Sequence, residues 1–276
     1  RNFLGTDAYL YKGQSLYLKG LSMKTRGYGY DGFYTRIPEG PGDLRATYER
    51  GAPLNRVNSK FEELAFRYFY VMDVVRSAKA TSSAYPRDVI YLVLRAKDNS
   101  ETIYFEYDPK HAFRFPFVVQ AHFAWLPNTY KGKRFVVRRV DGLNGLGITN
   151  DRIGFGDTLE CVSFFIEDRA YSVVASMKRG DGEEIVADPD KLTNETFLFS
   201  LEAAAKYAER FGDINYAHIV ANRVKTGMTR EMCRLSWGEP VGTNRIVHRQ
   251  GTLEQWVYPE ERYLYFESDT LTSIQN

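Results

Sequence analysis

The sequence predicts a mainly β protein that ends in an α+β domain. The chain of 276 residues contains 20 tyrosines and 18 phenylalanines, and such rings favour pleated, half-buried surfaces. Similar strand-like stretches recur before residue 190, whereas helical spacing of apolar residues begins only near Leu192. We therefore expect tandem small antiparallel β-barrel or sandwich modules, followed by helices packed on an antiparallel sheet.

The composition is typical of a globular chain with more than one core. The 37 Lys and Arg against 35 Asp and Glu give a net charge of +2, so no global field attracts nucleic acid or an anionic membrane. Apolar residues make 43% and charged residues 26%, which excludes wholesale disorder. No apolar run reaches the roughly 18 residues that span a bilayer. The length exceeds the roughly 150 residues usual for one domain.

Three stretches of the chain resemble one another: residues 11–21, 64–74 and 130–140. Each has the pattern of a strand that opens a module. Two later stretches, 91–105 and 171–186, have the pattern of β-hairpins with polar turns. We infer three all-β modules, at residues 1–58, 59–128 and 129–190. Modules of this size bury little surface, so we expect them to pack on one another.

The apolar positions that match between the three openings are Leu16, Phe69 and Phe135; Leu18, Val71 and Val137; and Leu21, Val74 and Val140.

A glycine motif at residues 27–32 matches the GxGxxG pattern of dinucleotide-binding proteins. A phosphate cradle needs a strand before the motif and a helix N-terminus after it. Here the stretch from Phe33 to Pro38 follows instead, so we expect an aromatic turn. A second cluster, Gly142, Gly145 and Gly147, lacks the lysine of a P-loop and is expected to be a loop between strands.

Helices are predicted in the last domain, residues 191–276. A first helix ends at Gly212, which suits a left-handed C-terminal cap. A second apolar stripe runs to Gly227, and Thr229 is placed as the N-cap of a short helix that ends at Gly238. The apolar residues of the first helix are Phe197, Leu201, Ala204, Ala205, Ala208 and Phe211, and those of the second are Tyr216, Ile219, Val220 and Val224.

Four strands are predicted after Pro240, at residues 244–249, 253–258, 262–267 and 271–274, with turns at 250–251 and 268–269. Two or three helices therefore pack on a meandering antiparallel sheet. Trp256 and Tyr258 are expected to cover the sheet face beneath the helices, because large aromatic side chains are usually buried.

Four motifs of this last domain occur in the order of a known family: VKTGMTREM at 224–232, WGEP at 237–240, WVY at 256–258 and YLYF at 263–266. Residues 214–276 resemble the SmpA/OmlA family of outer-membrane assembly lipoproteins. The resemblance implies a helix pair on a sheet, similar to the fold of the beta-lactamase inhibitor protein, together with protein binding and an envelope location. The typical member is a short lipoprotein with a lipidated cysteine, whereas β-modules come first here. Those modules resemble SH3-like barrels in size and opening strand.

No catalytic or metal motif is visible. The four histidines are scattered and form no HExxH motif. Cys161 and Cys233 form no CxxC motif, so we expect two buried thiols rather than a disulfide or a zinc site. We predict no cofactor, no metal and no catalytic residue. Acidic pairs at 62–63, 183–184 and 260–261 leave a distant glycosidase pair open.

The strongest local charge is a basic stretch in the third opening strand. It could hold nucleic-acid phosphates, anionic glycans or lipid headgroups, or it could be a solvated strand face with Phe135 and Val137 turned inward. Exposed aromatic residues could add binding surface. The predicted binding residues are Lys131, Lys133, Arg134, Arg138, Tyr28, Tyr30 and Trp125, and Arg139 belongs to the same stretch.

These patterns predict a non-enzymatic protein of the bacterial cell envelope, periplasmic or surface-exposed and lipid-anchored, or secreted, that binds another envelope protein or a glycan. One alternative is a cell-wall or glycan hydrolase with β-targeting modules. Another is a nucleic-acid binder that uses the basic strand, although the near-neutral charge argues against it. Because Arg1 is not a methionine, we expect that an N-terminal piece has been removed, and a signal peptide, a lipoprotein leader and a trimmed sequence all fit this start. Any membrane contact would come through such a removed anchor.

Overall fold

A computed structural model describes residues 1–40, 42–77, 89–140, 143, 153–167, 172–248 and 251–275. The protein is mainly β, with 37% strand and 24% helix, as predicted. It divides into two compact units: Arg1–Thr129 with Phe164–Val173, and Tyr130–Ser163 with Val174–Asn276. The second glycine cluster lies outside the described residues.

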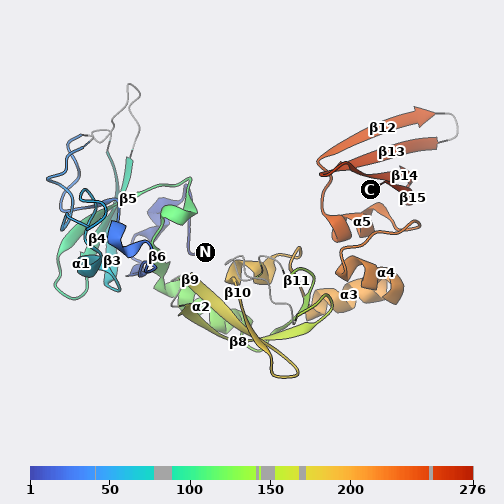
Figure 1. Cartoon of the computed structure of the whole chain (residues 1–276), viewed down its shortest axis with the longest axis horizontal. Coiled ribbons are helices and arrows are strands. Elements are labelled where there is room, and N and C mark those ends of the chain that lie inside the picture. The colour runs from blue at the N-terminus through green and yellow to red at the C-terminus, as the bar shows by residue number, and fades with distance from the viewer. Residues whose placement is uncertain are drawn as a thin grey trace. The chain divides into compact units, whose positions relative to one another are not determined.

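The first unit contains a six-stranded antiparallel sheet in the order β2-β5-β4-β3-β1-β6. Strands β3, β4, β5 and β6 are labelled in Figure 1. Leu16 of β1 is the register partner of Phe69 of β3. Strands from the first two predicted modules therefore share one sheet. The strands are β1 Ser15–Leu18, β2 Phe33–Tyr34, β3 Tyr68–Ser77, β4 Val89–Ala96, β5 Thr102–Tyr107 and β6 Phe117–Val119.

Aromatic rings fill the core of this unit. The centroid of Phe105 lies 5.0 Å from that of Phe33 and 5.1 Å from that of Phe117, within the range in which ring pairs add to simple burial. Much of the aromatic surplus in the sequence is thus core. Short helical segments surround the sheet: η1 Ala8–Tyr11, η2 Arg26–Tyr28, α1 Phe61–Leu64 and η3 Ala112–Arg114.

Helix α2, Gln120–Tyr130, was not predicted. Helical spacing of apolar residues begins only near Leu192. The apolar residues of α2 form no single stripe, Leu126 is its buried residue, and Pro127 lies inside it, where a proline removes a backbone donor. The spacing of apolar residues along the sequence therefore did not indicate this helix.

The second unit begins with a five-stranded sheet in the order β10-β9-β8-β7-β11. The predicted opening strand and hairpin of the third stretch are both present. The strands are β7 Arg134–Val137, β8 Thr158–Glu167, β9 Ser172–Arg179, β10 Glu184–Ala187 and β11 Leu198–Ser200, with η4 Pro189–Thr193 before β11.

Three of the predicted helix ends are present, at Gly212, Thr229 and Gly238. Two others are wrong: the second helix ends at Val220 rather than near Gly227, and Phe197 precedes strand β11 rather than lying in the first helix. Helix α3 spans Leu201–Phe211, α4 spans Asp213–Val220 and α5 spans Arg230–Trp237. Thr229 Oγ1 accepts a hydrogen bond from Met232 N at 3.3 Å, which makes it the N-cap of α5. Gly212 and Gly238 have φ values of 76° and 85° and end α3 and α5.

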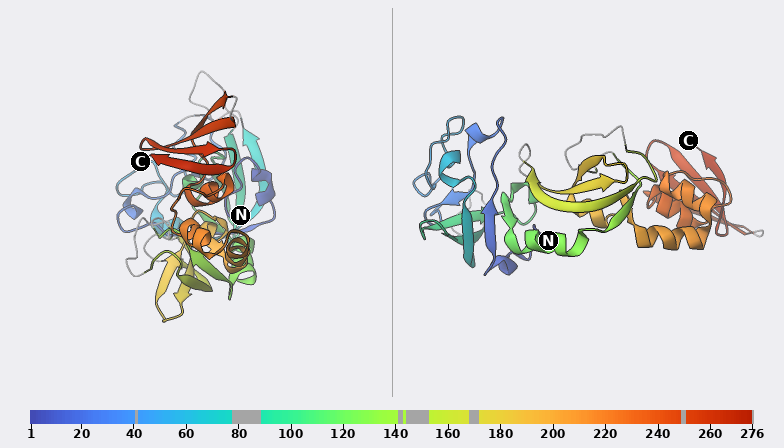
Figure 2. Two further views of the ribbon diagram at one scale, coloured as in Figure 1. Left: turned by 90° about the vertical axis from the view of Figure 1, so that its right-hand side faces the viewer. Right: turned by 90° about the horizontal axis from the view of Figure 1, so that it is seen from below.

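A four-stranded meander completes the second unit: β12 Gly242–His248, β13 Gly251–Tyr258, β14 Arg262–Glu267 and β15 Thr270–Gln275, paired in chain order. Figures 1 and 2 show the helices (orange) beside this sheet (red). One core joins them, and both Trp256 and Tyr258 are buried in it, as predicted.

Candidate functional site

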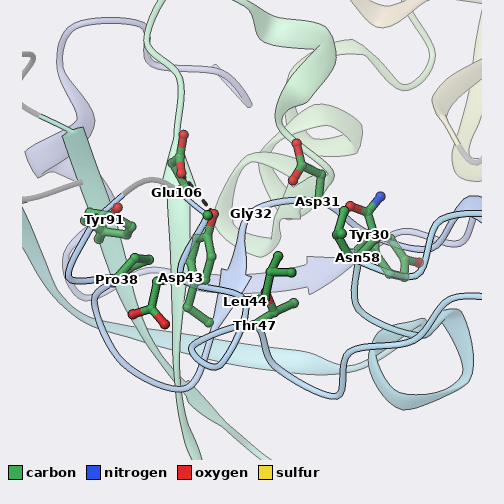
Figure 3. Close-up of a pocket in the computed structure, with 14 residues that line it drawn as sticks. Tyr30, Asp31, Gly32, Pro38, Asp43, Leu44, Thr47, Asn58, Tyr91 and Glu106 are labelled. Carbon is green, nitrogen blue, oxygen red and sulfur yellow. Dashed lines mark hydrogen bonds between the residues drawn. The ribbon is translucent and has the colours of Figure 1, made fainter. Parts of the chain in front are cut away.

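A pocket of about 230 Å³ opens in the first unit beside β2, β4 and β5 (Figure 3). Adjacent residues of a strand point to opposite faces of the sheet. Phe33 and Phe105 are register partners and belong to the buried core. Tyr34, Tyr91 and Glu106 therefore share the other face, because Tyr91 is the register partner of Glu106. Residues between 38 and 58 supply most of the remaining lining.

Two tyrosines and a carboxylate form the centre of the pocket. Tyr34 Oη donates a hydrogen bond to Glu106 Oε2 at 3.2 Å, drawn as a dashed line in Figure 3. The rings of Tyr34 and Tyr91 meet edge to face, with centroids 6.1 Å apart. Tyr91 is fully buried, and its hydroxyl has no hydrogen-bond partner among the described residues. A buried hydroxyl in this state is an unused donor and acceptor.

Burial raises the pKa of Glu106. The hydrogen bond from Tyr34 acts in the opposite direction, and the negative charge of Asp31 adds to the rise. Burial also raises the pKa of Tyr34 and of Tyr91. Both hydroxyls therefore stay protonated at neutral pH and can donate hydrogen bonds.

Two further carboxylates line the pocket, and each has an arginine partner. Asp31 Oδ2 lies 3.0 Å from Arg114 Nη2, and Asp43 Oδ2 lies 2.8 Å from Arg36 Nη1. A hydrogen bond from the backbone N–H of Glu39, together with Arg36, lowers the pKa of Asp43. The pocket therefore presents charged, partnered carboxylates at Asp31 and Asp43 and a buried one at Glu106.

The described residues contain no group of three or more His, Cys, Asp or Glu that could hold a metal ion. Both cysteines are free and buried, as predicted. Burial raises the pKa of Cys161 to about 11 and that of Cys233 to about 12. Neither thiol is thus an activated nucleophile at neutral pH.

Comparison with known proteins finds no similar family model, no similar curated protein and no similar solved structure. Within the part of the chain that the structure describes, no helix is both long enough and apolar enough to cross a membrane. The site must therefore be interpreted from its own geometry.

The predicted binding residues are divided between the two units. Tyr28, Tyr30 and Trp125 belong to the first unit, whereas the basic stretch belongs to the second. Tyr28 and Trp125 are 51% and 47% exposed, and neither lines the pocket. Lys131, Lys133 and Arg134 are exposed beside β7. Of these predicted residues, Tyr30 alone lines the pocket of the first unit.

The expected exposure is wrong for Tyr30 and Arg138, each of which is 3% exposed. Tyr30 stacks on Phe61 at 6.0 Å between centroids and donates from its hydroxyl to Lys19 O at 2.6 Å. Arg138 follows β7 and donates to main-chain oxygens of distant segments. Local sequence gave no indication of either contact, because the partners are remote along the chain.

The central residues of the pocket, Tyr34, Tyr91 and Glu106, were missed. Only Tyr91 lies in a predicted hairpin; Glu106 directly follows that hairpin, and Tyr34 follows the glycine motif that was expected to be an aromatic turn. The register between strands decides which of those polar positions meet. That pairing joins residue 34 to residue 104 and residue 91 to residue 106, and periodicity alone does not supply it.

Proposed function

We propose that this chain is a non-enzymatic binding protein of the bacterial cell envelope, and that a glycan occupies the pocket around Tyr34, Tyr91 and Glu106. The observation that carries the proposal is the buried hydroxyl of Tyr91, which has no hydrogen-bond partner among the described residues and lies beside a carboxylate and a second tyrosine. Leaving such a group unsatisfied costs about 1–3 kcal/mol. A ligand hydroxyl that displaced the lining over this group would recover that free energy.

The chemistry of the lining suits a sugar. The half-buried ring of Tyr34 offers an apolar face to the C–H groups of a sugar ring, while Glu106 and Asp31 accept hydrogen bonds from hydroxyls. The volume of about 230 Å³ lies below the roughly 300–1,000 Å³ of pockets that enclose drug-sized ligands. A single sugar residue, at the end or side of a longer glycan, is the occupant that fits.

Titration calorimetry of the full chain with a panel of glycans tests the proposal. The panel contains the disaccharide repeat of peptidoglycan and neutral glucose and galactose oligosaccharides. We expect at least one to bind, and Tyr91→Phe and Glu106→Gln to weaken that binding about five- to tenfold, as expected for one lost hydrogen bond. Tyr9→Phe is the matched control, because Tyr9 is exposed and does not line the pocket.

The proposal is contradicted if no glycan of the panel binds at millimolar concentration. It is also contradicted if Tyr9→Phe weakens binding as much as Tyr91→Phe does, because the effect would then not come from the pocket.

A glycan hydrolase is the second candidate. Burial and the charge of Asp31 raise the pKa of Glu106, and a carboxyl with a raised pKa next to a second carboxylate is the arrangement of a glycosidase acid. Release of reducing ends from the same glycans would support this candidate. Turnover must then be abolished by Glu106→Gln. Binding without turnover would support the binding protein instead.

The proposed envelope location and partner protein rest on the resemblance of residues 214–276 to the SmpA/OmlA family. The packing of helices on the four-stranded meander supports this proposal. The division into tandem modules at residues 1–58, 59–128 and 129–190 stays a prediction, as does the domain boundary at residue 191. Fractionation of the source cells with an antiserum tests the location. Detection in the cytoplasmic fraction alone would contradict it.

A further inference from the structure

A second pocket, of about 490 Å³, lies in the C-terminal unit and is rich in arginine. Four arginines and one glutamate, Glu195, line it. Rings from Trp237 and Tyr258 form part of its wall. The arginines are Arg138, Arg139, Arg234 and Arg262.

Arg138 is a buried cation whose hydrogen-bond partners are all neutral. Its Nη2 donates to Ile219 O at 3.2 Å and to Asn222 Oδ1 at 3.0 Å. The same guanidinium also donates to the main-chain oxygens of Glu195 and Leu235. Ile219 and Leu235 lie in the last turns of α4 and α5, where the carbonyl dipoles favour a positive charge.

The negative charge of Glu195 opposes the effect of burial on Arg138, but among the described residues no carboxylate forms an ion pair with it. No carboxylate lies within 4.0 Å of Arg138 there, and its Nε has no hydrogen-bond partner. Carbonyl groups satisfy N–H donors but carry only partial charges, and a buried ion without a counter-ion is costly. Burial accordingly lowers the pKa of Arg138 to about 10.

Aromatic rings hold the outer arginines in place. The guanidinium of Arg262 lies 5.1 Å from the centroid of Trp237, and that of Arg234 lies 4.5 Å from the centroid of Trp256. Arg234 also pairs with Glu239 at 3.0 Å, but side-chain exposures of 45% and 75% make this a solvent-screened contact. Arg262 donates from Nε to Pro259 O at 3.2 Å and lies 3.9 Å from Glu260, which is also a solvent-screened contact. An anionic ligand in the pocket would compete with these two exposed carboxylates for Arg234 and Arg262.

We propose that this pocket binds a phosphate monoester. The planar fork of arginine matches the oxygens of phosphate, and several guanidinium groups suit a ligand with a charge of roughly −1.5 to −2 rather than a single carboxylate. The rings of Trp237 and Tyr258 give an apolar wall for the organic part of the ligand. The ester can come from a phosphorylated sugar or from a lipid headgroup, which share this chemistry.

This inference uses residues of the second unit and is independent of the glycan proposal for the first. No residue belongs to both pockets. A negative result for phosphate binding therefore does not contradict glycan binding, and the reverse also holds.

Titration calorimetry of the full chain with inorganic phosphate and glucose 6-phosphate tests the inference, with glucose and glucuronate as comparison ligands. We expect both phosphates to bind, to bind more tightly than glucuronate, and to weaken steeply as salt is added. Arg234→Gln and Arg262→Gln each lower the affinity about tenfold. Arg245→Gln, an exposed arginine of β12 outside the pocket, leaves the affinity unchanged.

Flotation with phosphatidylcholine vesicles, with and without phosphatidate, separates the two sources. Binding of the soluble phosphates alone identifies a sugar-type ligand, and additional binding of phosphatidate vesicles that requires Arg234 and Arg262 identifies the headgroup. The inference is overturned if neither phosphate source binds, if glucuronate binds more tightly, or if Arg245→Gln weakens binding as much as the two pocket variants do.

Discussion

Two chemically identical substitutions in the first pocket should change stability in opposite directions. Tyr91→Phe removes a buried hydroxyl that has no hydrogen-bond partner among the residues that the structure describes. Tyr34→Phe removes a hydroxyl that donates to Glu106 at 3.2 Å. The rings stay in both variants, so the edge-to-face contact at 6.1 Å is kept. The difference between them isolates the hydrogen bond.

The magnitudes follow from the two environments. An unsatisfied buried hydroxyl destabilises by about 1–3 kcal/mol, so Tyr91→Phe should raise the free energy of unfolding by at least about 1 kcal/mol. Tyr34→Phe should lower it by about 1.5–3 kcal/mol, the usual contribution of a hydrogen bond to a charged group. A change of 1 kcal/mol shifts Tm by about 2–4 °C for a domain of 150–250 residues.

Hydrogen–deuterium exchange of the β4 and β5 amides is the appropriate assay, because it reports on the first unit alone. Protection should increase in Tyr91→Phe and decrease in Tyr34→Phe. Changes in amide protection of the same sign in both variants would refute the reasoning. They would mean that the hydroxyl of Tyr91 has a hydrogen-bond partner or that Tyr34 does not stabilise Glu106.

Three further predictions concern pH, a close backbone approach and a helix cap. Because burial raises the pKa of Glu106 above its ordinary 4.5, the folded state binds more protons than the unfolded state above pH 4.5, so stability falls as pH rises through the raised pKa. Glu106→Gln should remove this fall, which can be followed by urea unfolding at a series of pH values between 4 and 8. If the free energy of unfolding of Glu106→Gln still fell with pH as in the wild type, the prediction would be contradicted. Gly29→Ala would place a Cβ 2.0 Å from Ser59 O at a φ of +64°, and should lower the free energy of unfolding by more than about 2 kcal/mol. Gly42 has a similar φ of +74° but no atom near the added Cβ, so Gly42→Ala should lower it by only about 1–2 kcal/mol. Equal thermal unfolding midpoints for Gly29→Ala and Gly42→Ala would contradict this prediction. Thr229→Ala removes the N-cap of α5 and should lower the free energy of unfolding in urea by about 1 kcal/mol. Thr226→Ala, at an exposed position, should leave it unchanged. Equal losses of free energy in the two variants would show that the cap does not contribute.

The C-terminal domain was the most predictable part of the chain because its determinants are local. Thr229, Gly212 and Gly238 act within one turn of the helix ends that they set. The amphipathic helices and the alternating strands of the meander likewise carry their pattern in consecutive residues. By contrast, α2 contains Pro127 and no apolar stripe, so its helical form depends on tertiary context.

The candidate site was not predictable for a related reason. Tyr34, Tyr91 and Glu106 come from three strands and meet only through the register of β2, β4 and β5. Arg138 was predicted as part of the exposed basic stretch, but its hydrogen-bond partners lie from 57 to 98 positions away along the chain. The pattern of a single strand indicates which faces are polar, but it does not indicate which remote carbonyls will surround a guanidinium.

The position of β1 also constrains how the protein forms during synthesis. β1 lies between β3 and β6, and both are made after it. On the ribosome, residues 15–18 must wait without strand partners until residue 68 and then residue 117 have emerged. A circular permutant that starts at β3 would make these partners first. It should therefore spend less of its synthesis time with β1 open to chaperones and aggregation.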